Sequence, residues 1–596
     1  MAATVPMSSV TVPDGLVRVG PREALPGVTV VSGGRHGIAV FAPPGDGQVY
    51  AVDNRCPHMG FPLHRGSVCD GILTCHWHHA RFDLESGGTF DPFADDVQTY
   101  PVIVQDGMVY VDPRPQRGDR IAYARKRLRD GLEQSLGLVM AKNVLALLES
   151  GEPSAGIIEI GGVFGVQYRA IGWRSGLTIL SAMGNVLPVL APDDRMLALY
   201  HGLVHVARDC AGQAPRHFLD PLPGDDVPFD RLADWFRQFI DVRDARGAER
   251  ALLTAIEQGV SSSDLAGMLA TAATDHAFVD GGHTLDFVNK ACEMLDLIGW
   301  EHASDILPGL TPVLASSTRS EELNSWRRPV DLIALLDPVF AHIDDLVATA
   351  VANPEWNDPD SLVATLLGDD PGAAIAALTT ALEDGAPLER VSLAVSYAAS
   401  LRVAHFHTSN EFNDWITVLH TFTYANATHQ LMRRSPSATV LRGVYHGVVS
   451  LYLTRFLNMP AARLPESQES ALAALPTDRD ALLDALRDAL DREQQVELAG
   501  QIAWRYLDLG HEPHRLIAML GHVLLREDGE FHSYQMLEAG IALYRELAPI
   551  APDRANRVLV AVAHYLAGHA PTSRSMLQTA RTARRLAAGE DLYAGE

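Results

Sequence analysis

Two short stretches decide how the N-terminal part of this 596-residue chain is interpreted: Cys56-Pro57-His58 and, after sixteen intervening residues, Cys75-His76-Trp77-His78. Each stretch offers one thiolate and one imidazole, spaced as Cys-x-His and as Cys-x-x-His. This set of donors suits a tetrahedral zinc site with two sulfur and two nitrogen ligands. It equally suits a 2Fe–2S cluster with two thiolates on one iron and two imidazoles on the other. The spacing by itself leaves both centres open.

The sequence around the two stretches, from about Leu16 to Asp112, has the pattern of a small antiparallel β domain. Short apolar runs alternate with turns rich in Gly, Pro and Asp. Gln105-Asp106-Gly107 predicts a tight hairpin between the last two runs. We therefore expect an all-β sandwich or barrel over residues 16–112, followed by a proline-containing linker at 113–120. The apolar runs are Val28–Val31, Ile38–Phe41, Val49–Val52, Val102–Val104 and Met108–Val111.

The two stretches and their neighbours resemble the Rieske family. The resemblance extends from Cys56 to Leu63 and from Cys75 to Asp83, with a Gly87-Gly88 pair beyond. It implies a 2Fe–2S cluster with Cys56 and Cys75 on the buried iron and His58 and His78 on the outer iron. A zinc finger would instead expect a helix that carries its histidines, so the β context favours the cluster over zinc. The resemblance covers residues 16–112 and does not extend further.

The residues next to the expected ligands indicate a cluster of low reduction potential. High-potential members of the family have a disulfide between the two ligand loops, and Phe61 and Trp77 occupy those positions here. Such members also place a serine and a tyrosine after the second histidine, where this chain has Ala80 and Phe82. Hydrogen bonds to sulfur stabilise the reduced cluster, so the loss of both hydroxyl groups lowers the potential. The resemblance thus implies the ferredoxin or oxygenase type.

From about Ile121 the sequence becomes rich in Ala and Leu at helical spacing. We expect a multidomain chain: an N-terminal all-β Rieske domain followed by a large, mainly α-helical domain. A boundary near residue 350 divides the helical part into 121–350 and 351–596. The clearest helical stretches are Ala122–Leu148, Arg195–Ala207, Leu285–Leu297, Ser392–Val403, Asp480–Leu486 and Val558–Ala567.

Faint internal similarity within the helical part suggests a repeat and a second metal site. The segment from His283 to Asn289 resembles that from His420 to Asn426, and Leu199–Val204 resembles Val444–Val449. Duplicated helical hairpins would explain both pairs. Two histidines four residues apart share one helix face and can chelate one ion. We therefore expect a second, non-haem iron gathered by His201, His205, His283, His420 and His446; buried, hydrogen-bonded core histidines are the alternative.

Composition excludes several classes of partner. Lys and Arg number 48 against 74 Asp and Glu, a formal net charge of −26 that repels phosphate backbones and anionic lipid. We therefore expect no nucleic acid and no membrane as partner. Five cysteines are too few and too irregular for a disulfide scaffold, and residues 1–15 lack the pattern of a secretory leader, so a cytoplasmic location is expected. No dinucleotide-binding fingerprint is found, which predicts a separate reductase as electron donor.

The expected function is that of a Rieske oxidoreductase. In our first hypothesis it is an oxygenase, whose cluster feeds electrons to a His-rich metal site that acts on a small organic substrate. The usual cue of such enzymes, an Asp two residues before His-x4-His, has no clean match: His564 and His569 have the spacing, but Ala561 replaces the acid. The alternative is an electron-transfer or redox-sensing adaptor whose helical domain only docks partners. Nothing in the sequence favours a third option, a hydrolase-like helical domain.

Overall fold

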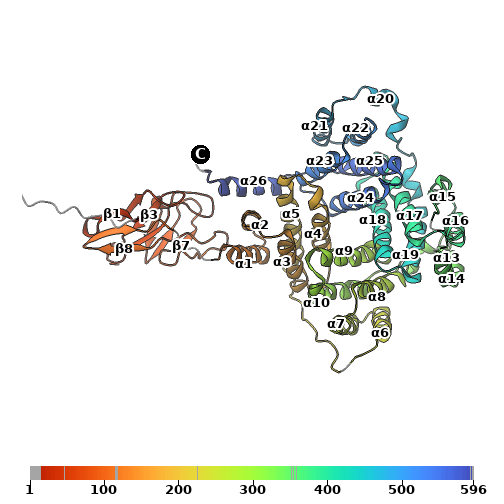
Figure 1. Cartoon of the computed structure of the whole chain (residues 1–596), viewed down its shortest axis with the longest axis horizontal. Coiled ribbons are helices and arrows are strands. Elements are labelled where there is room, and N and C mark those ends of the chain that lie inside the picture. The colour runs from red at the N-terminus through yellow and green to blue at the C-terminus, as the bar shows by residue number, and fades with distance from the viewer. Residues whose placement is uncertain are drawn as a thin grey trace, which may run out of the picture. The chain divides into compact units, whose positions relative to one another are not determined.

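A computed structural model describes residues 15–45, 47–114, 119–224, 226–350, 352–353, 355–357, 359–590 and 592 (Figure 1). The chain divides into two compact units. Unit 1 comprises Met1–Glu152 together with Gln578–Glu596, and unit 2 comprises Pro153–Leu577. Residues 115–118 of the expected linker lie outside the described residues.

The described strands of unit 1 form three small antiparallel sheets, ordered β1-β9-β8, β2-β3-β4 and β5-β6-β7. The all-β Rieske expectation for this region is confirmed. Five strands agree with the apolar runs to within a residue, whereas β1 and β5–β7 lie outside those runs. The bounds are β1 Val17–Pro21, β2 Val28–Val31, β3 Ile38–Phe41, β4 Tyr50–Asp53, β5 Ser67–Cys69, β6 Ile72–Thr74, β7 Arg81–Asp83, β8 Val102–Gln105 and β9 Met108–Val111.

Strand β3 lies at the centre of the β domain because both of its faces are buried. Ile38 and Val40 pack into one apolar cluster, while Ala39 and Phe41 pack into another that also contains Cys56 and Cys75. The two-residue period of a strand produces this division. The expected turn at Asp106-Gly107 joins β8 to β9, and both residues have positive φ, as a tight hairpin requires.

Two helices, α1 (Arg120–Glu133) and α2 (Gly137–Glu149), complete the N-terminal part of unit 1. The sequence pattern predicted one helix over Ala122–Leu148. That prediction was wrong at residues 134–136, because Ser135 adopts a positive φ of 54° that ends the first helix. Helix α1 contacts the β domain, because Arg127 donates to the carbonyl oxygens of Pro92 and Ala94, each at 2.8 Å.

Unit 2 is helical throughout most of its described length, which confirms the expected helical remainder. Its helices are α3 Ser154–Gln167, α4 Ser175–Val186, α5 Pro192–Cys210, α6 Phe229–Asp241, α7 Ala245–Glu257, α8 Ser262–Thr274, α9 His283–Ile298, α10 Ala303–Ile306, α11 Thr311–Ser316, α12 Asn324–Arg327, α13 Leu332–Phe340, α14 Ile343–Thr349, α15 Asp360–Leu366, α16 Pro371–Glu383, α17 Leu388–Ala404, α18 Phe412–Arg434, α19 Ala438–Leu453, α20 Glu469–Ala473, α21 Arg479–Leu490, α22 Val496–Asp508, α23 Pro513–Leu525, α24 Phe531–Leu547 and α25 Pro552–Gly568. A last helix, α26 (Ser575–Ala588), begins in unit 2 and ends in unit 1.

Helices from both sides of residue 350 pack against one another in unit 2. Helix α9 contacts α18, and α4 contacts α24, while α17, α18 and α19 form consecutive packed neighbours. The boundary that we expected near residue 350 therefore lies within one compact unit. Of the segments that suggested a repeat, two belong to the adjacent helices α18 and α19, whereas the other two belong to α5 and α9, which are separated in the chain by α6–α8.

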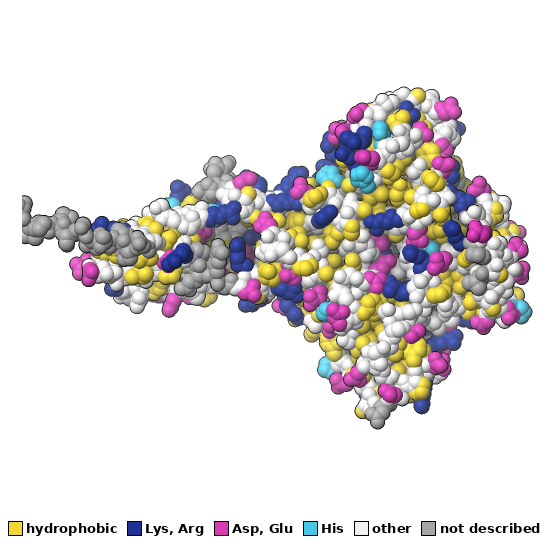
Figure 2. Space-filling model, viewed as in Figure 1, with side chains coloured by type: hydrophobic (Ala, Val, Ile, Leu, Met, Phe, Trp, Pro, Cys, Tyr) yellow, Lys and Arg dark blue, Asp and Glu magenta, His cyan; other side chains and the backbone are white. Residues whose placement is uncertain are grey.

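The surface of unit 2 is of mixed charge on the face shown in Figure 2, where acidic and basic side chains are interspersed. Among the described residues, none of the helices combines the length and the apolar character needed to cross a bilayer.

Candidate metal centres

The two cysteine–histidine stretches form loops with the same backbone pattern. The first follows β4, and the second connects β6 to β7. In each loop the cysteine carbonyl accepts a hydrogen bond from the N–H four residues later, Gly60 in one and His79 in the other. Each cysteine N–H in turn donates to the carbonyl five residues later, at 2.8 Å for Cys56 and 2.9 Å for Cys75. The loops thus present equivalent side chains in equivalent directions.

The two cysteine sulfurs lie together inside the β domain. Cys56 is 3% exposed and Cys75 is 1% exposed, and neither forms a disulfide. A hydrogen bond from the Cys56 thiol, together with the backbone N–H groups of Trp77 and His78, lowers the pKa of Cys75 to about 6. The same hydrogen bond and burial raise the pKa of Cys56. A pair of buried sulfurs in which one is readily ionised is suited to bind metal as thiolate.

The two histidines lie nearer the surface than the sulfurs. The rings of His58 and His78 meet edge to face with centroids 4.9 Å apart, and Phe93 packs against His58 at the same distance. His78 is exposed and His58 is half-buried. The Nδ1 atom of His58 is buried, yet it has no hydrogen-bond partner among the described residues, which is the condition expected of a nitrogen that awaits a ligand. The arrangement fits a 2Fe–2S cluster with buried thiolates and outer imidazoles.

Phe61 and Trp77 link the two loops by an aromatic contact, with ring centroids 6.2 Å apart. Ala80 and Phe82 are fully buried in the apolar cluster that contains both cysteines. The two side chains that lack a hydroxyl group thus belong to the same apolar cluster as the cysteine sulfurs.

A search of protein families matches residues 16–101 to the Rieske [2Fe-2S] domain. Residues 16–101 are a Rieske domain. A domain of this kind implies a 2Fe–2S cluster, and the resemblance seen in the sequence is confirmed.

The chain is also similar over part of its length to curated proteins. It is 38% identical over 68 residues to the 3-phenylpropionate/cinnamic acid dioxygenase ferredoxin subunit of Photorhabdus laumondii, which covers 11% of this chain and 65% of that protein. It is 32% identical over 77 residues to the ferredoxin component of the alkene monooxygenase system of Xanthobacter autotrophicus, covering 12% and 63%. Human apoptosis-inducing factor 3 is 29% identical over 114 residues, covering 19% and 18%. The chain thus matches less than two thirds of the length of each relative.

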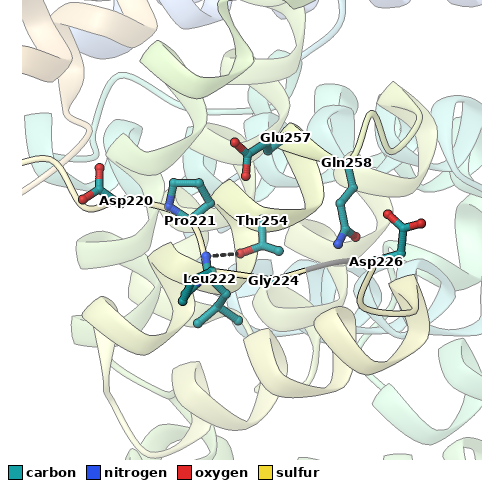
Figure 3. A pocket seen from close by; sticks show the side chains of 9 residues that line it. Asp220, Pro221, Leu222, Gly224, Asp226, Thr254, Glu257 and Gln258 are labelled. Atoms are coloured by element: carbon teal, nitrogen blue, oxygen red, sulfur yellow. Dashed lines mark hydrogen bonds between the residues drawn. The ribbon is translucent and has the colours of Figure 1, made fainter.

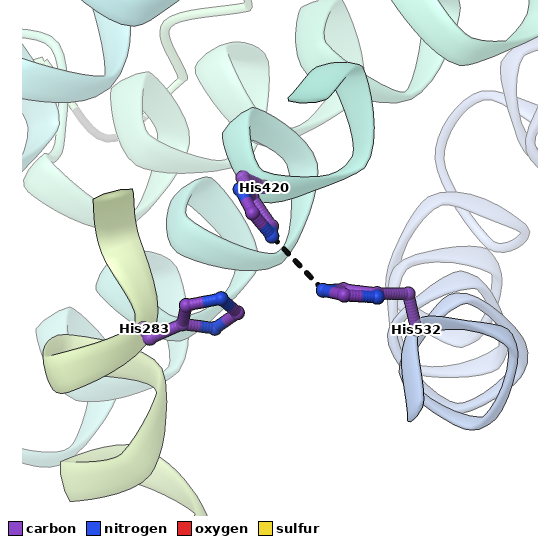
Figure 4. Close-up of side chains that lie close together, drawn as sticks. All are labelled: His283, His420 and His532. Atoms are coloured by element: carbon purple, nitrogen blue, oxygen red, sulfur yellow. Dashed lines mark hydrogen bonds between the residues drawn. The ribbon is translucent and has the colours of Figure 1, made fainter. Parts of the chain in front are cut away.

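In the helical unit, three histidines from three helices converge on one point (Figure 4). His283 begins α9, His420 lies in α18 and His532 lies in the first turn of α24. One ring nitrogen from each lies within 4.8 Å of the others, and Nε2 of His420 is 2.9 Å from Nε2 of His532. All three residues are partly exposed, and the His532 side chain is 13% exposed.

Glu530 orients His532. Its Oε2 atom accepts the Nδ1–H of His532 at 2.8 Å and also caps α24 by accepting the backbone N–H of His532. Although burial raises the pKa of Glu530, its hydrogen bond with His532 lowers it to about 2. A carboxylate on Nδ1 leaves the Nε2 lone pair of the histidine directed at the shared point, the arrangement common among metal-binding histidines. Burial and neighbouring histidines lower the pKa of His283 to about 4 and that of His420 to about 2, so both are neutral donors.

A strained turn positions His283. Phe278, Asp280, Gly281 and Gly282 all have positive φ, although only two of them are glycines. The hydroxyl of Ser320 donates to the carbonyl oxygen of Phe278 at 3.0 Å, and the backbone N–H of Asp280 donates to Thr318 at 2.8 Å. These contacts hold the unfavourable backbone in place just before His283, and strained backbone of this kind is frequent at functional sites.

The structure thus brings together two of the five histidines that the sequence suggested, and adds His532. Of the others, His201 bonds through Nδ1 to the hydroxyl of Tyr534 at 2.9 Å, and the ring of His205 packs against the same tyrosine. His446 contacts the hydroxyl of Tyr424 at 3.4 Å. The expectation that all five surround one ion is therefore revised to His283, His420 and His532. One signal for His532 was present in the sequence: an acid two residues before it at the start of a helix.

A separate surface depression of about 540 Å³ lies at the end of α7 (Figure 3). Its lining includes Asp220, Asp226 and Glu257, and the backbone N–H of Leu222 donates to Thr254 at 2.9 Å. None of the histidines discussed above lines it, and we assign it no role.

Proposed function

We propose that this chain is a Rieske-type oxygenase with two metal centres. The N-terminal centre is a 2Fe–2S cluster bound by Cys56, Cys75, His58 and His78. The second is a mononuclear iron bound by His283, His420 and His532 in the helical unit. A separate reductase supplies the electrons, and the substrate is a small organic molecule.

The geometry of the N-terminal loops supports the cluster ligands. Two unoxidised sulfurs are buried together, two imidazoles lie outside them, and Nδ1 of His58 has no other partner among the described residues. The cluster supplies transfer of one electron at a time. Around it the protein excludes water from the sulfurs through Ala80 and Phe82 and offers neither hydroxyl that raises the potential in other members. A low potential suits a donor to oxygen chemistry.

The convergence of three histidine nitrogens carries the proposal for the second centre. Three neutral imidazoles on one ion leave further positions open to water, dioxygen or substrate. Imidazole sites accept zinc, copper, nickel or iron. We choose iron because an electron-transfer domain on the same chain has a use only for an ion that changes its oxidation state. Glu530 holds His532 in the orientation that binding requires.

Iron analysis of the full chain, purified without oxygen, tests this function. We expect about three iron atoms per chain. Two of them give the electron-spin signal of the reduced cluster, and the third is lost in His420→Ala and His532→Ala. Both variants keep the cluster signal. His446→Ala is the matched control, because this buried histidine lies on the neighbouring helix α19, and it should retain all the iron.

The second candidate is an electron-transfer adaptor, and it is favoured by the similarity of the Rieske domain to ferredoxin components. For this function the chain would bind two iron atoms, and substitution of the three histidines would leave that number unchanged. A third ion that proves to be zinc would likewise overturn the oxygenase.

A further inference from the structure

Helices α9 and α24 carry a series of polar side chains that begins at His283 and His532 of the three-histidine site and continues along both helices. On α9, Asp286, Lys290 and Glu293 follow His283 at three, seven and ten residues. On α24, Gln535 and Glu538 follow His532 at three and six residues. These intervals correspond to successive turns of one helix side.

The members of this series bond to one another between the helices. The amide of Gln535 donates to the carboxylate of Asp286. One turn further, Nζ of Lys290 lies 2.5 Å from Glu538 and 2.7 Å from Glu293. Asn185 of α4 joins the same two carboxylates, at 2.8 Å from Glu293 and 3.0 Å from Glu538.

The middle of the series is buried, and Glu293, the member farthest from His283 on α9, is partly exposed. Asp286, Lys290 and Gln535 are each 1% exposed, whereas the Glu293 side chain is 15% exposed. Oε1 of Gln535 is buried and accepts no hydrogen bond from the described residues, which leaves an acceptor for a water molecule beside Asp286. Three carboxyl groups around one ammonium are costly to bury, and hydrophobic side chains of similar size would be at least as stable.

We propose that Glu293, Glu538 and Asp286 form a proton-delivery chain from solvent to the three-histidine site, with Lys290 as the counter-charge. This inference rests on the proposed oxygenase function. Insertion of oxygen from dioxygen with two external electrons takes up two protons, and the electrons come from the reductase through the Rieske domain. For each proton, the Asp286 carboxyl O–H bond breaks and the proton is taken up by an oxygen atom of the dioxygen that is reduced at the site. The resulting carboxylate regains a proton from Glu538, which is reprotonated from solvent through Glu293. Each round of transfer therefore moves one proton from solvent to the site, and these residues carry no electron.

The electrostatics of the site agree with this direction of transfer. Burial raises the pKa of Asp286 to about 8 against the opposing effect of Lys290, so this carboxyl holds a proton at neutral pH. Burial also raises the pKa of Glu538. The charged groups that act on Asp286 are Lys290 and Glu293 on its own helix and Glu538 on α24; α4 contributes the neutral Asn185 and Ser181.

The first test does not depend on iron. Infrared spectra of the full chain, recorded after dilution into deuterium oxide at neutral pH, follow exchange at the buried protonated carboxyl. We expect a carboxyl band that is absent in Asp286→Asn, and whose exchange slows roughly tenfold in Glu293→Gln. Glu546→Gln is the matched control, because Glu546 lies on α24 but pairs with His429 and Arg433. In this variant the exchange of the Asp286 carboxyl should be unchanged.

The second test follows oxygen uptake by the reduced, iron-loaded chain with and without deuterated solvent. Asp286→Asn and Glu293→Gln should keep their iron but lose roughly tenfold or more in rate, with a larger solvent isotope effect than the wild type. Wild-type rates of oxygen uptake in both variants, with iron bound, together with wild-type exchange of the Asp286 carboxyl in Glu293→Gln, would overturn the proton-delivery proposal and leave the oxygenase intact. Absence of the third iron from the wild type overturns the oxygenase. The infrared exchange then still decides whether Glu293, Glu538 and Asp286 conduct protons.

Discussion

The ammonium group of Lys142 donates a hydrogen bond of 2.6 Å to the carbonyl oxygen of Pro57. Helix α2 therefore contacts the loop that carries Cys56 and His58. Asp95 pairs with the same lysine and with Arg127, so the contact belongs to an ionic group at the edge of the Rieske domain. Burial raises the pKa of Asp95, but the charge of Lys142 is among the causes that keep this pKa low. A helix outside the β fold thus places a positive charge beside the cluster loop.

Replacing Lys142 should lower the reduction potential of the cluster. A positive charge nearby stabilises the reduced, more negative state, so Lys142→Gln is expected to shift the potential down by roughly 20–60 mV. A redox titration of the full chain followed by electron-spin resonance measures the shift. Lys126→Gln is the control, because Lys126 is an exposed lysine on the neighbouring helix α1. Equal potentials in the two variants would contradict the electrostatic role of Lys142.

His79 occupies a backbone position that favours glycine, since its φ is 62°. Gly60 occupies the equivalent position in the other loop, with φ of 90°. His79→Gly should therefore raise the stability of the Rieske domain by about 0.5–1 kcal/mol, because relief of the left-handed strain exceeds the entropy lost by glycine. Thermal unfolding measures the change. His76→Gly, in the same loop but at an ordinary φ, should be destabilising; a loss of stability in both variants would refute the strain at His79.

The Rieske domain could be predicted from the sequence because the two cysteine–histidine pairs that we propose as its ligands lie on two local loops. Each loop is defined within five residues, and neighbours such as Ala80 report the surroundings of the sulfurs directly. The strands β5–β7 were missed because three-residue strands are too short to show a period of two. The left-handed φ of Ser135 was missed because serine gives no sign of it.

The three-histidine site could be predicted only in part because tertiary packing creates it. His283 and His420 shared a sequence pattern, but His532 lies 112 residues beyond His420, and only the packing of α24 on α18 brings them together. The i, i+4 spacing of His201 and His205 correctly placed both on one helix face. That face meets Tyr534, which spacing within one helix cannot reveal.

Ser320 should contribute to metal affinity without touching the metal. Its hydroxyl supports the strained turn that precedes His283. In Ser320→Ala we expect the affinity for Co²⁺, used as a spectroscopic probe, to fall roughly tenfold, within the range found for indirect partners of metal ligands. Ser316→Ala is the control, because Ser316 is exposed and donates within its own helix. The interpretation fails if Ser320→Ala binds Co²⁺ as tightly as the control variant.

Asp286 should make the stability of the helical unit depend on pH. Its pKa is about 8 in the folded chain against 3.8 as the ordinary value, so the folded state binds more protons between these limits. Stability then falls as pH rises from about 4 to 8, by at most about 1.4 kcal/mol per pH unit, and levels off above. Asp286→Asn removes this dependence. Its melting temperature relative to the wild type should therefore rise between pH 5.5 and 8 and stay constant beyond.

Glu546→Gln tests the opposite case, a carboxyl group whose pKa is lowered in the folded chain. Burial raises the pKa of Glu546, but the hydrogen bond with His429 and the neighbouring charges lower it below the ordinary value of 4.5. The carboxylate of Glu546 therefore contributes its full stabilisation at every pH well above 4.5. The melting temperature of this variant should lie below that of the wild type by the same amount at pH 6 and pH 8. If Asp286→Asn instead shows a constant offset from the wild type over that range, Asp286 is already ionised in the folded chain, and it has no proton to deliver.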